Sequence, residues 1–169
     1  MAVMQRILEP ELMSDPVQAG AYAGADFSEP NQAFCDFLLA RFPDLPNDCR
    51  AIDLGCGPAD IVRRLALARP KWRFTAIDGS DAMLAPARRM VLEANLLHRV
   101  ELVCGRLPNL PDTIAKHSYD LVISNSLLHH LPDPLVLWRT ACALGKPGAP
   151  VIVGDLLRPQ SPTAAQALV

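Results

Sequence analysis

The chain has 169 residues, a formal net charge of −2 and an apolar fraction of 50%. This length supports one domain with a sizeable core, and the composition is that of an ordinary globular protein. The balanced charge offers no basic surface for nucleic acid, and no apolar run approaches the ~18 residues of a membrane-spanning helix. We therefore expect neither a nucleic-acid partner nor a membrane partner.

The five cysteines are scattered and include no C-x-x-C pair. Such a set indicates reduced thiols, not a disulfide framework or a zinc site. No histidine and acid cluster has metal-ligand spacing, so no metal is predicted. The N-terminal residues lack the basic and then apolar pattern of a secretion signal, which favours a cytoplasmic location.

The first 48 residues precede the predicted sheet. Ser28 and Pro30 indicate a helix start with Ser28 as its cap, and Phe34 and Phe37 are expected to pack on the sheet. Pro43 is expected to end this helix.

The segment before this helix, residues 17–27, is rich in alanine and glycine. It is interpreted as a surface helix and turn.

From residue 49 onward, strand and helix patterns alternate. We expect strands near 50–54, 72–77, 100–104, 119–124 and 150–154, and helices near 59–68, 81–94 and 134–144. Short, continuously apolar strands are typical of a parallel sheet that is covered on both faces. Right-handed crossovers then predict an α/β fold: a doubly wound, mostly parallel sheet of about five strands with helices on both faces.

The helix expected near 134–144 has clear boundary signals, with Asp133 as its cap and Gly145 at its end. Its core-facing residues are predicted to be Leu135, Trp138, Ala141 and Leu144.

A glycine-rich turn, Gly55-Cys56-Gly57, follows the first strand and leads directly into a helix. Asp78 lies 21 residues beyond Gly57, at the end of the second strand pattern. This is the layout of a nucleoside-binding βαβ unit, in which glycines admit the ligand and the later acid accepts hydrogen bonds from the ribose.

A dinucleotide fingerprint would require glycine or alanine at the sixth position counted from Gly55, where this chain has Asp60. The chain also lacks a Tyr-x-x-x-Lys pair, because Tyr22 and Tyr119 are followed four residues later by Asp26 and Ile123. An NAD-dependent oxidoreductase is therefore the less favoured alternative.

The segment Asp53-Leu54-Gly55-Cys56-Gly57 resembles motif I of the class I S-adenosylmethionine (SAM)-dependent methyltransferases. Further segments are similar to later parts of that family in order and spacing, so the resemblance covers roughly residues 49–158. These are residues 76–84 for the ribose-binding motif, 103–111 for the adenine loop, 119–131 for the fourth strand and its loop, and 146–153 for the turn into strand five.

The resemblance implies SAM as the cofactor. It assigns cofactor binding to Asp53, Gly55, Cys56, Gly57, Asp78, Gly79, Met83, Arg106, Leu107, Ser124 and Asn125. Two positions depart from the family pattern: Ala59 stands where a third glycine is usual, and Arg106 replaces an acid that commonly binds adenine. The adenine contacts are then expected from the backbone near Arg106 and Leu107 and from Met83.

The implied activity is transfer of the SAM methyl group to a small-molecule acceptor, with His130 or His129 as a general base for a hydroxyl. A histidine pair that merely caps its loop is the alternative role. The loop that begins at Asn125 departs from the Asn-Pro-Pro-Tyr type, which disfavours nucleic-acid bases as acceptors. The alternative function is a nucleoside-binding module with little or no catalysis.

The resemblance also divides the chain. The resemblance implies that residues 1–48 form a helical lid, with Tyr22 and Asp26 as candidate ligand contacts. Residues 49–169 are expected to form a SAM-binding core that lacks the family's C-terminal strands. Residues 161–169 are interpreted as the start of a further helix. An uncovered strand at Val151–Val153 would expose an apolar edge, from which we expect self-association.

Overall fold

The structure is a computed structural model that describes residues 12–156 and 161. Its strands are β1 (Arg50–Leu54), β2 (Arg73–Asp78), β3 (Val100–Cys104), β4 (Leu121–Asn125) and β5 (Val151–Gly154). Its helices are α1 (Pro16–Gly24), α2 (Ser28–Arg41), α3 (Asp60–Ala68), α4 (Asp81–Glu93), the short 3-10 helix η1 (Leu128–His130) and α5 (Leu135–Leu144). The helices and strands predicted from residue 49 to residue 154 are all present, and their ends differ from the prediction by at most two residues.

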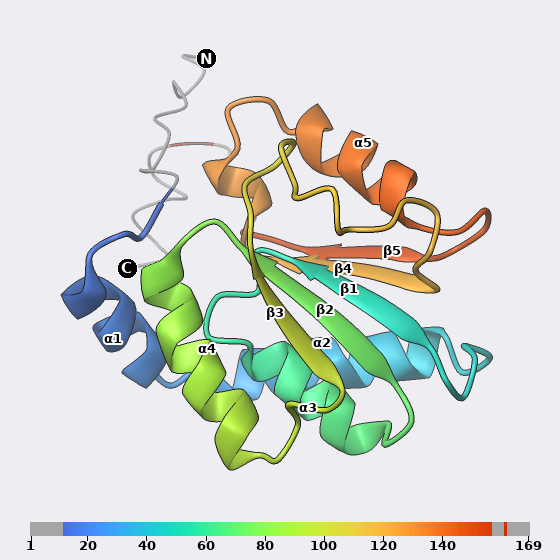
Figure 1. The fold of residues 1–169 in the computed structure, drawn as a ribbon, viewed down its shortest axis with the longest axis horizontal. Coiled ribbons are helices and arrows are strands. Elements are labelled where there is room, and N and C mark those ends of the chain that lie inside the picture. The colour runs from blue at the N-terminus through green and yellow to red at the C-terminus, as the bar shows by residue number, and fades with distance from the viewer. Residues whose placement is uncertain (1–11, 157–160, 162–169) are drawn as a thin grey trace.

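The five strands form one parallel sheet in the order β3-β2-β1-β4-β5 (Figure 1). In β1, Asp53 is in register with Ala76 of β2 on one side and with Ile123 of β4 on the other. The strand order reverses between β1 and β4, so the crossovers diverge there. Ligands of doubly wound folds bind at such a switch point, outside the carboxyl ends of the strands.

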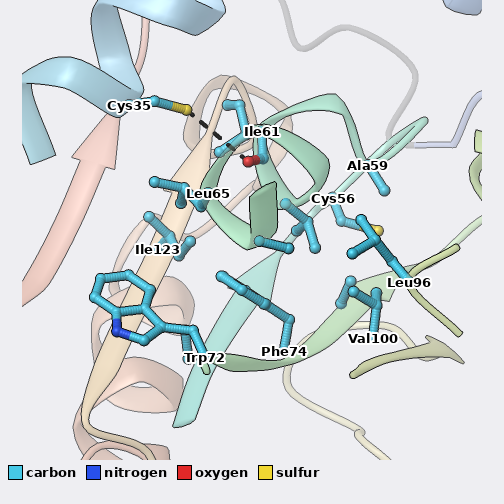
Figure 2. Close-up of a cluster of buried hydrophobic side chains, with 14 of the residues drawn as sticks. Cys35, Cys56, Ala59, Ile61, Leu65, Trp72, Phe74, Leu96, Val100 and Ile123 are labelled. Carbon is cyan, nitrogen blue, oxygen red and sulfur yellow. Dashed lines mark hydrogen bonds between the residues drawn. The ribbon is translucent and has the colours of Figure 1, made fainter. Parts of the chain in front are cut away.

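Helices α2, α3 and α4 cover one face of the sheet, and α5 covers the other (Figure 1). The first face buries a cluster in which Leu65 of α3 packs with Phe74 of β2 and Ile123 of β4 (Figure 2). The second face buries Ile52 of β1 against Leu137 of α5. Burial of both faces explains the continuously apolar strands and confirms the predicted doubly wound α/β class.

The buried face of α5 differs from the prediction. Leu135 and Trp138 are 51% and 41% exposed, whereas Leu137 is fully buried. The buried residues of α5 are Leu137, Thr140, Ala141 and Leu144. Their spacing of i, i+3, i+4 and i+7 defines one helical stripe, and Leu135 and Trp138 lie outside it.

Two predictions for α2 are also wrong. The N-cap of α2 is Phe27 and Ser28 is the first helical residue; Asp26 accepts hydrogen bonds from the Ser28 backbone N–H and hydroxyl. Phe37 is 61% exposed and does not pack on the sheet. Phe34 packs against the first core cluster, as expected.

Strand β5 lies at one edge of the sheet and pairs with β4, with Ile123 in register with Ile152. Within residues 12–156, no strand pairs with its other side. The helix predicted over residues 161–169 lies outside the described residues except for Ser161. The part of the chain that the structure describes contains no helix long and apolar enough to cross a membrane.

Candidate functional site

The glycine-rich turn links the carboxyl ends of β1 and β2. The backbone N–H groups of Gly55 and Cys56 both donate to the carbonyl of Ile77, each at 2.8 Å. Gly55 has φ +79°, and a Cβ there would lie 3.0 Å from the Leu127 side chain. Glycine is therefore needed for both backbone conformation and space. Ala59, at the position of the usual third glycine, also adopts a left-handed φ of 65°.

Asp78, at the end of β2, binds this turn through its carboxylate. Its Oδ2 accepts a hydrogen bond from the Gly57 N–H at 2.8 Å, and its Oδ1 accepts one from the Ser80 N–H at 2.9 Å. Burial raises the pKa of Asp78, while these two hydrogen bonds and the nearby His130 oppose the rise. A carboxylate has about four acceptor positions, so this one can still accept hydrogen bonds from a ligand.

Asp53 lies beside Asp78 but has a different environment. It is only 2% exposed, and no described residue donates a hydrogen bond to its carboxylate. Burial raises the pKa of Asp53 to about 7, and the negative charge of Asp78 adds to the rise. A buried carboxylate without a hydrogen-bond donor can bind a cationic or hydrogen-bond-donating group of a ligand.

These groups line one cavity of about 1020 Å³. It includes eight of the residues proposed from the sequence: Asp53, Gly55, Cys56, Gly57, Asp78, Met83, Asn125 and His130. Residues from the ends of β1, β2 and β4 thus meet at the switch point of the sheet.

Five other proposed residues do not line this cavity: Gly79, Arg106, Leu107, Ser124 and His129. Ser124 is buried and donates its hydroxyl to the carbonyl of Leu54 at 2.8 Å, which joins β4 to β1. A Cβ on Gly79 would lie 3.0 Å from Cγ of Arg106, so these two residues pack together beside the site.

The segment before the sheet also borders the cavity. Tyr22 and Asp26, the two candidate lid contacts, both line it. The ring of Tyr22 lies 4.9 Å from that of Phe27, centroid to centroid. Burial raises the pKa of Tyr22, and the negative charge of Asp78 adds to the rise.

Sequence reasoning missed a polar group at the start of α3. Asp60 accepts hydrogen bonds from Arg64 at 2.7 Å and from Asn31 of α2 at 3.0 Å, and it pairs with Arg63 at 2.7 Å. Burial alone would raise the pKa of Asp60, but these partners lower it. Asn31, Asp60 and Arg64 line the cavity, and the contact between α2 and α3 that joins them has no local signal in the sequence.

The second missed residue is Asp155, directly after β5. Its Oδ1 lies 2.7 Å from Nδ1 of His129, and its Oδ2 accepts a hydrogen bond from the Leu128 N–H at 2.7 Å. Asp155 lines the cavity with His130, whose ring lies 4.1 Å from that of His129. A polar residue at the carboxyl end of a parallel strand was a usable signal, as it was for Asp78.

Across residues 12–156 and 161, no three His, Cys, Asp or Glu side chains gather in a way that could hold a metal ion. The polar groups that line the cavity include carboxylates, an arginine, an imidazole, side-chain amides and hydroxyls, and backbone N–H groups. Such a set can bind hydroxyl and ammonium groups and can accept a proton.

The model of a family described as a methyltransferase domain matches residues 51–148. The chain is 35% identical over 112 residues to a trans-aconitate 2-methyltransferase of Streptomyces avermitilis, covering 64% of this chain and 40% of that protein. It is 32% identical over 130 residues to a ubiquinone biosynthesis O-methyltransferase of Xanthomonas campestris, covering 76% of this chain and 51% of that protein. The chain thus spans about half the length, or less, of these curated relatives.

A solved structure of a SAM-dependent methyltransferase from Aquifex aeolicus has the same fold, with a TM-score of 0.69 and 22% identity. The match covers 88% of this chain and 78% of that one. The family match favours the methyltransferase interpretation of the glycine turn over the dehydrogenase one. This chain belongs to the class I SAM-dependent methyltransferases, a family whose methyl donor is SAM.

Proposed function

We propose that this chain binds SAM in the cavity at the switch point and supports methyl transfer to a small-molecule acceptor. One observation carries the proposal: the glycine turn, Asp53 and Asp78 line one cavity. The glycines admit a ligand close to the backbone, and the two carboxylates offer acceptors for its hydroxyl and ammonium groups.

The volume of the cavity is sufficient for a ligand of the size of SAM. Pockets of roughly 300–1,000 Å³ hold one drug-sized ligand, and this cavity measures about 1020 Å³. SAM against the Asp53 and Asp78 wall would leave the side near Asn125 and His130 for the acceptor.

The sulfonium of SAM supplies an activated methyl group, so the protein has mainly to bind, align and exclude water. Asp78 would hold the ribose, Gly55 and Gly57 would approach the methionine part, and Met83 would contact the adenine. Arg106 and Leu107 would contribute only through their backbone or at the rim. His130 would accept the proton of a hydroxyl acceptor. His129, whose ring lies 4.1 Å from that of His130, would help to position it.

A small-molecule acceptor is favoured by the net charge of −2, which gives no overall basic character for binding nucleic acid. The acceptor named for one relative, trans-aconitate, belongs to a longer protein of which the match covers 40%, and it is not transferred to this chain.

Calorimetric titration with S-adenosylhomocysteine tests the proposal. We expect micromolar binding by the parent and its loss in Asp78→Ala, with Asp78→Asn as the variant that keeps one acceptor oxygen. Asp81→Ala is the matched control, because Asp81 is 75% exposed in the first turn of α4. No binding by the parent contradicts the proposal. Binding without SAM consumption across an acceptor panel indicates the alternative, a binding module.

The lid and core division is a further part of this proposal: residues 1–48 as lid, residues 49–169 as core. It is supported by Tyr22 of α1, which lines the cavity. Tyr22→Ala is expected to weaken S-adenosylhomocysteine binding, whereas Phe37→Ala, an exposed aromatic of α2 outside the cavity, leaves it unchanged.

We also infer self-association through β5, because its apolar Val151–Val153 edge pairs only with β4 among the described strands. Light scattering at tens of micromolar tests this, and a clean monomer contradicts it.

A cytoplasmic location is proposed on the five free cysteines, of which Cys35, Cys49 and Cys56 are buried. Localisation of a tagged chain tests it.

A further inference from the structure

Among the described ionisable groups that line the cavity, Asp53 has the fewest partners that would stabilise its charged form. It occupies the fourth position of the central strand β1 and is 2% exposed. Asp78, on the neighbouring strand, accepts hydrogen bonds from two backbone N–H groups, whereas no described donor reaches the Asp53 carboxylate. An ionised carboxylate without donors is strongly unfavourable in such a place.

The described groups that face Asp53 do not stabilise a negative charge on its carboxylate. Asp78 from β2 adds a second negative charge, and Cys56 of the glycine turn and Cys35 of α2 are neutral thiols whose pKa values are raised. His130 of η1 acts on Asp78. Arg64, the arginine of the cavity wall, donates instead to Asp60 and Gln32, each at 2.7 Å.

We infer that Asp53 carries a proton in the ligand-free cavity near neutral pH and releases it to solvent when the ammonium group of a ligand binds. This inference rests on the proposed SAM site. The ammonium belongs to the amino-acid part of SAM and S-adenosylhomocysteine, so Asp53 selects ligands that carry this part against the bare nucleoside. Proton release then accompanies binding.

The sign of the pH effect follows from linkage. The ligand-bound form favours ionised Asp53, so it binds fewer protons than the free form. Apparent affinity therefore rises with pH and levels off only at pH values well above the Asp53 pKa of about 7, where free Asp53 is mostly ionised. Below this value, affinity falls by close to tenfold per pH unit until the carboxyl protonates in the complex as well.

The test is calorimetry with S-adenosylhomocysteine in phosphate and in imidazole, two buffers that cover pH 6 to 7 and have different ionisation heats. From the difference in heat we expect release of roughly half a proton at pH 7 and close to one at pH 6. Asp53→Asn should release none, and neither should the parent with 5′-methylthioadenosine, which lacks the amino-acid part. Buffer-independent heats for the parent overturn the inference, as does equal release by Asp53→Asn or with methylthioadenosine.

A second measurement does not depend on the variant. Carbon NMR of labelled aspartate carboxyls in the ligand-free protein should show one group that titrates near pH 7 and ionises when S-adenosylhomocysteine is added. Absence of such a carboxyl overturns the inference while leaving the SAM site intact. Failure of the parent to bind S-adenosylhomocysteine at all instead removes the proposed function, and the inference with it.

Discussion

Asp155 holds the loop after β4 against the end of β5. Its Oδ1 lies 2.7 Å from Nδ1 of His129, and its Oδ2 accepts the Leu128 N–H at 2.7 Å. The Asp155 side chain is 12% exposed and that of His129 is 23% exposed. One carboxylate therefore orients both the backbone and a ring of the segment that presents His130 to the cavity.

Replacing Asp155 by alanine should loosen this segment. Loss of charge-assisted hydrogen bonds at a partly buried site is expected to lower the free energy of unfolding by about 1–3 kcal/mol. The amides of residues 128 and 129 should exchange faster with deuterium. Asp155→Asn is the control, because its amide oxygen can still accept from His129 or Leu128. Equal exchange in both variants would show that Asp155 does not hold the loop.

Gly55→Ala should destabilise the protein and weaken ligand binding. The left-handed φ is unfavourable for alanine, and the new Cβ would press on Leu127, so we expect a loss of about 2–4 kcal/mol in chemical denaturation. Gly20→Ala in α1 is the matched control, since nothing lies within 4 Å of its added Cβ. It should raise stability by about 0.5–1 kcal/mol through helix propensity. A neutral Gly55→Ala contradicts the geometry of the turn.

Asp120 forms an ion pair at the opposite end of the sheet, and we expect acid to break it. It accepts hydrogen bonds from Nζ of Lys146 at 2.6 Å and from the Arg50 N–H at 2.9 Å. Burial alone would raise the pKa of Asp120, but these partners lower it overall. A lowered pKa contributes stability above the unfolded value, and this contribution is lost as pH falls through the folded value.

Asp120→Asn should therefore destabilise the protein at pH 7 by about 1–2 kcal/mol, a figure that allows for solvent screening of the partly exposed Lys146. The difference between parent and variant should shrink towards zero below about pH 3. Urea denaturation across pH measures it, and a difference that persists unchanged at low pH argues against the ion pair.

Asp53 should behave in the opposite way in the ligand-free protein. Because its pKa is raised to about 7, the parent loses stability as pH rises from about 4 to 7 and then levels off. Asp53→Asn should be more stable than the parent above pH 7, by up to about 4 kcal/mol as an order of magnitude, while binding S-adenosylhomocysteine more weakly. A destabilised variant at pH 8 contradicts the absence of donors at this carboxylate.

Local sequence patterns were sufficient to predict those features that depend only on short segments of the chain. The strand and helix alternation, the turn at Gly55 and the position of Asp78 follow from hydrophobic runs and from glycine conformation, which are properties of short segments. The same reasoning failed for Trp138 and Phe37, because helical spacing identifies several possible stripes and only the neighbouring sheet decides which one is buried.

The sequence by itself determined the class of fold, the family and the carboxyl-end position of Asp53 and Asp78, since these depend on motifs in a defined order. Only the tertiary structure decided which polar groups meet. Asp155 with His129, Asp60 with Asn31, and Asp53 without a donor are relationships between strands and helices far apart in the chain. Their energies depend on burial and on facing partners, and no local sequence pattern contains either quantity.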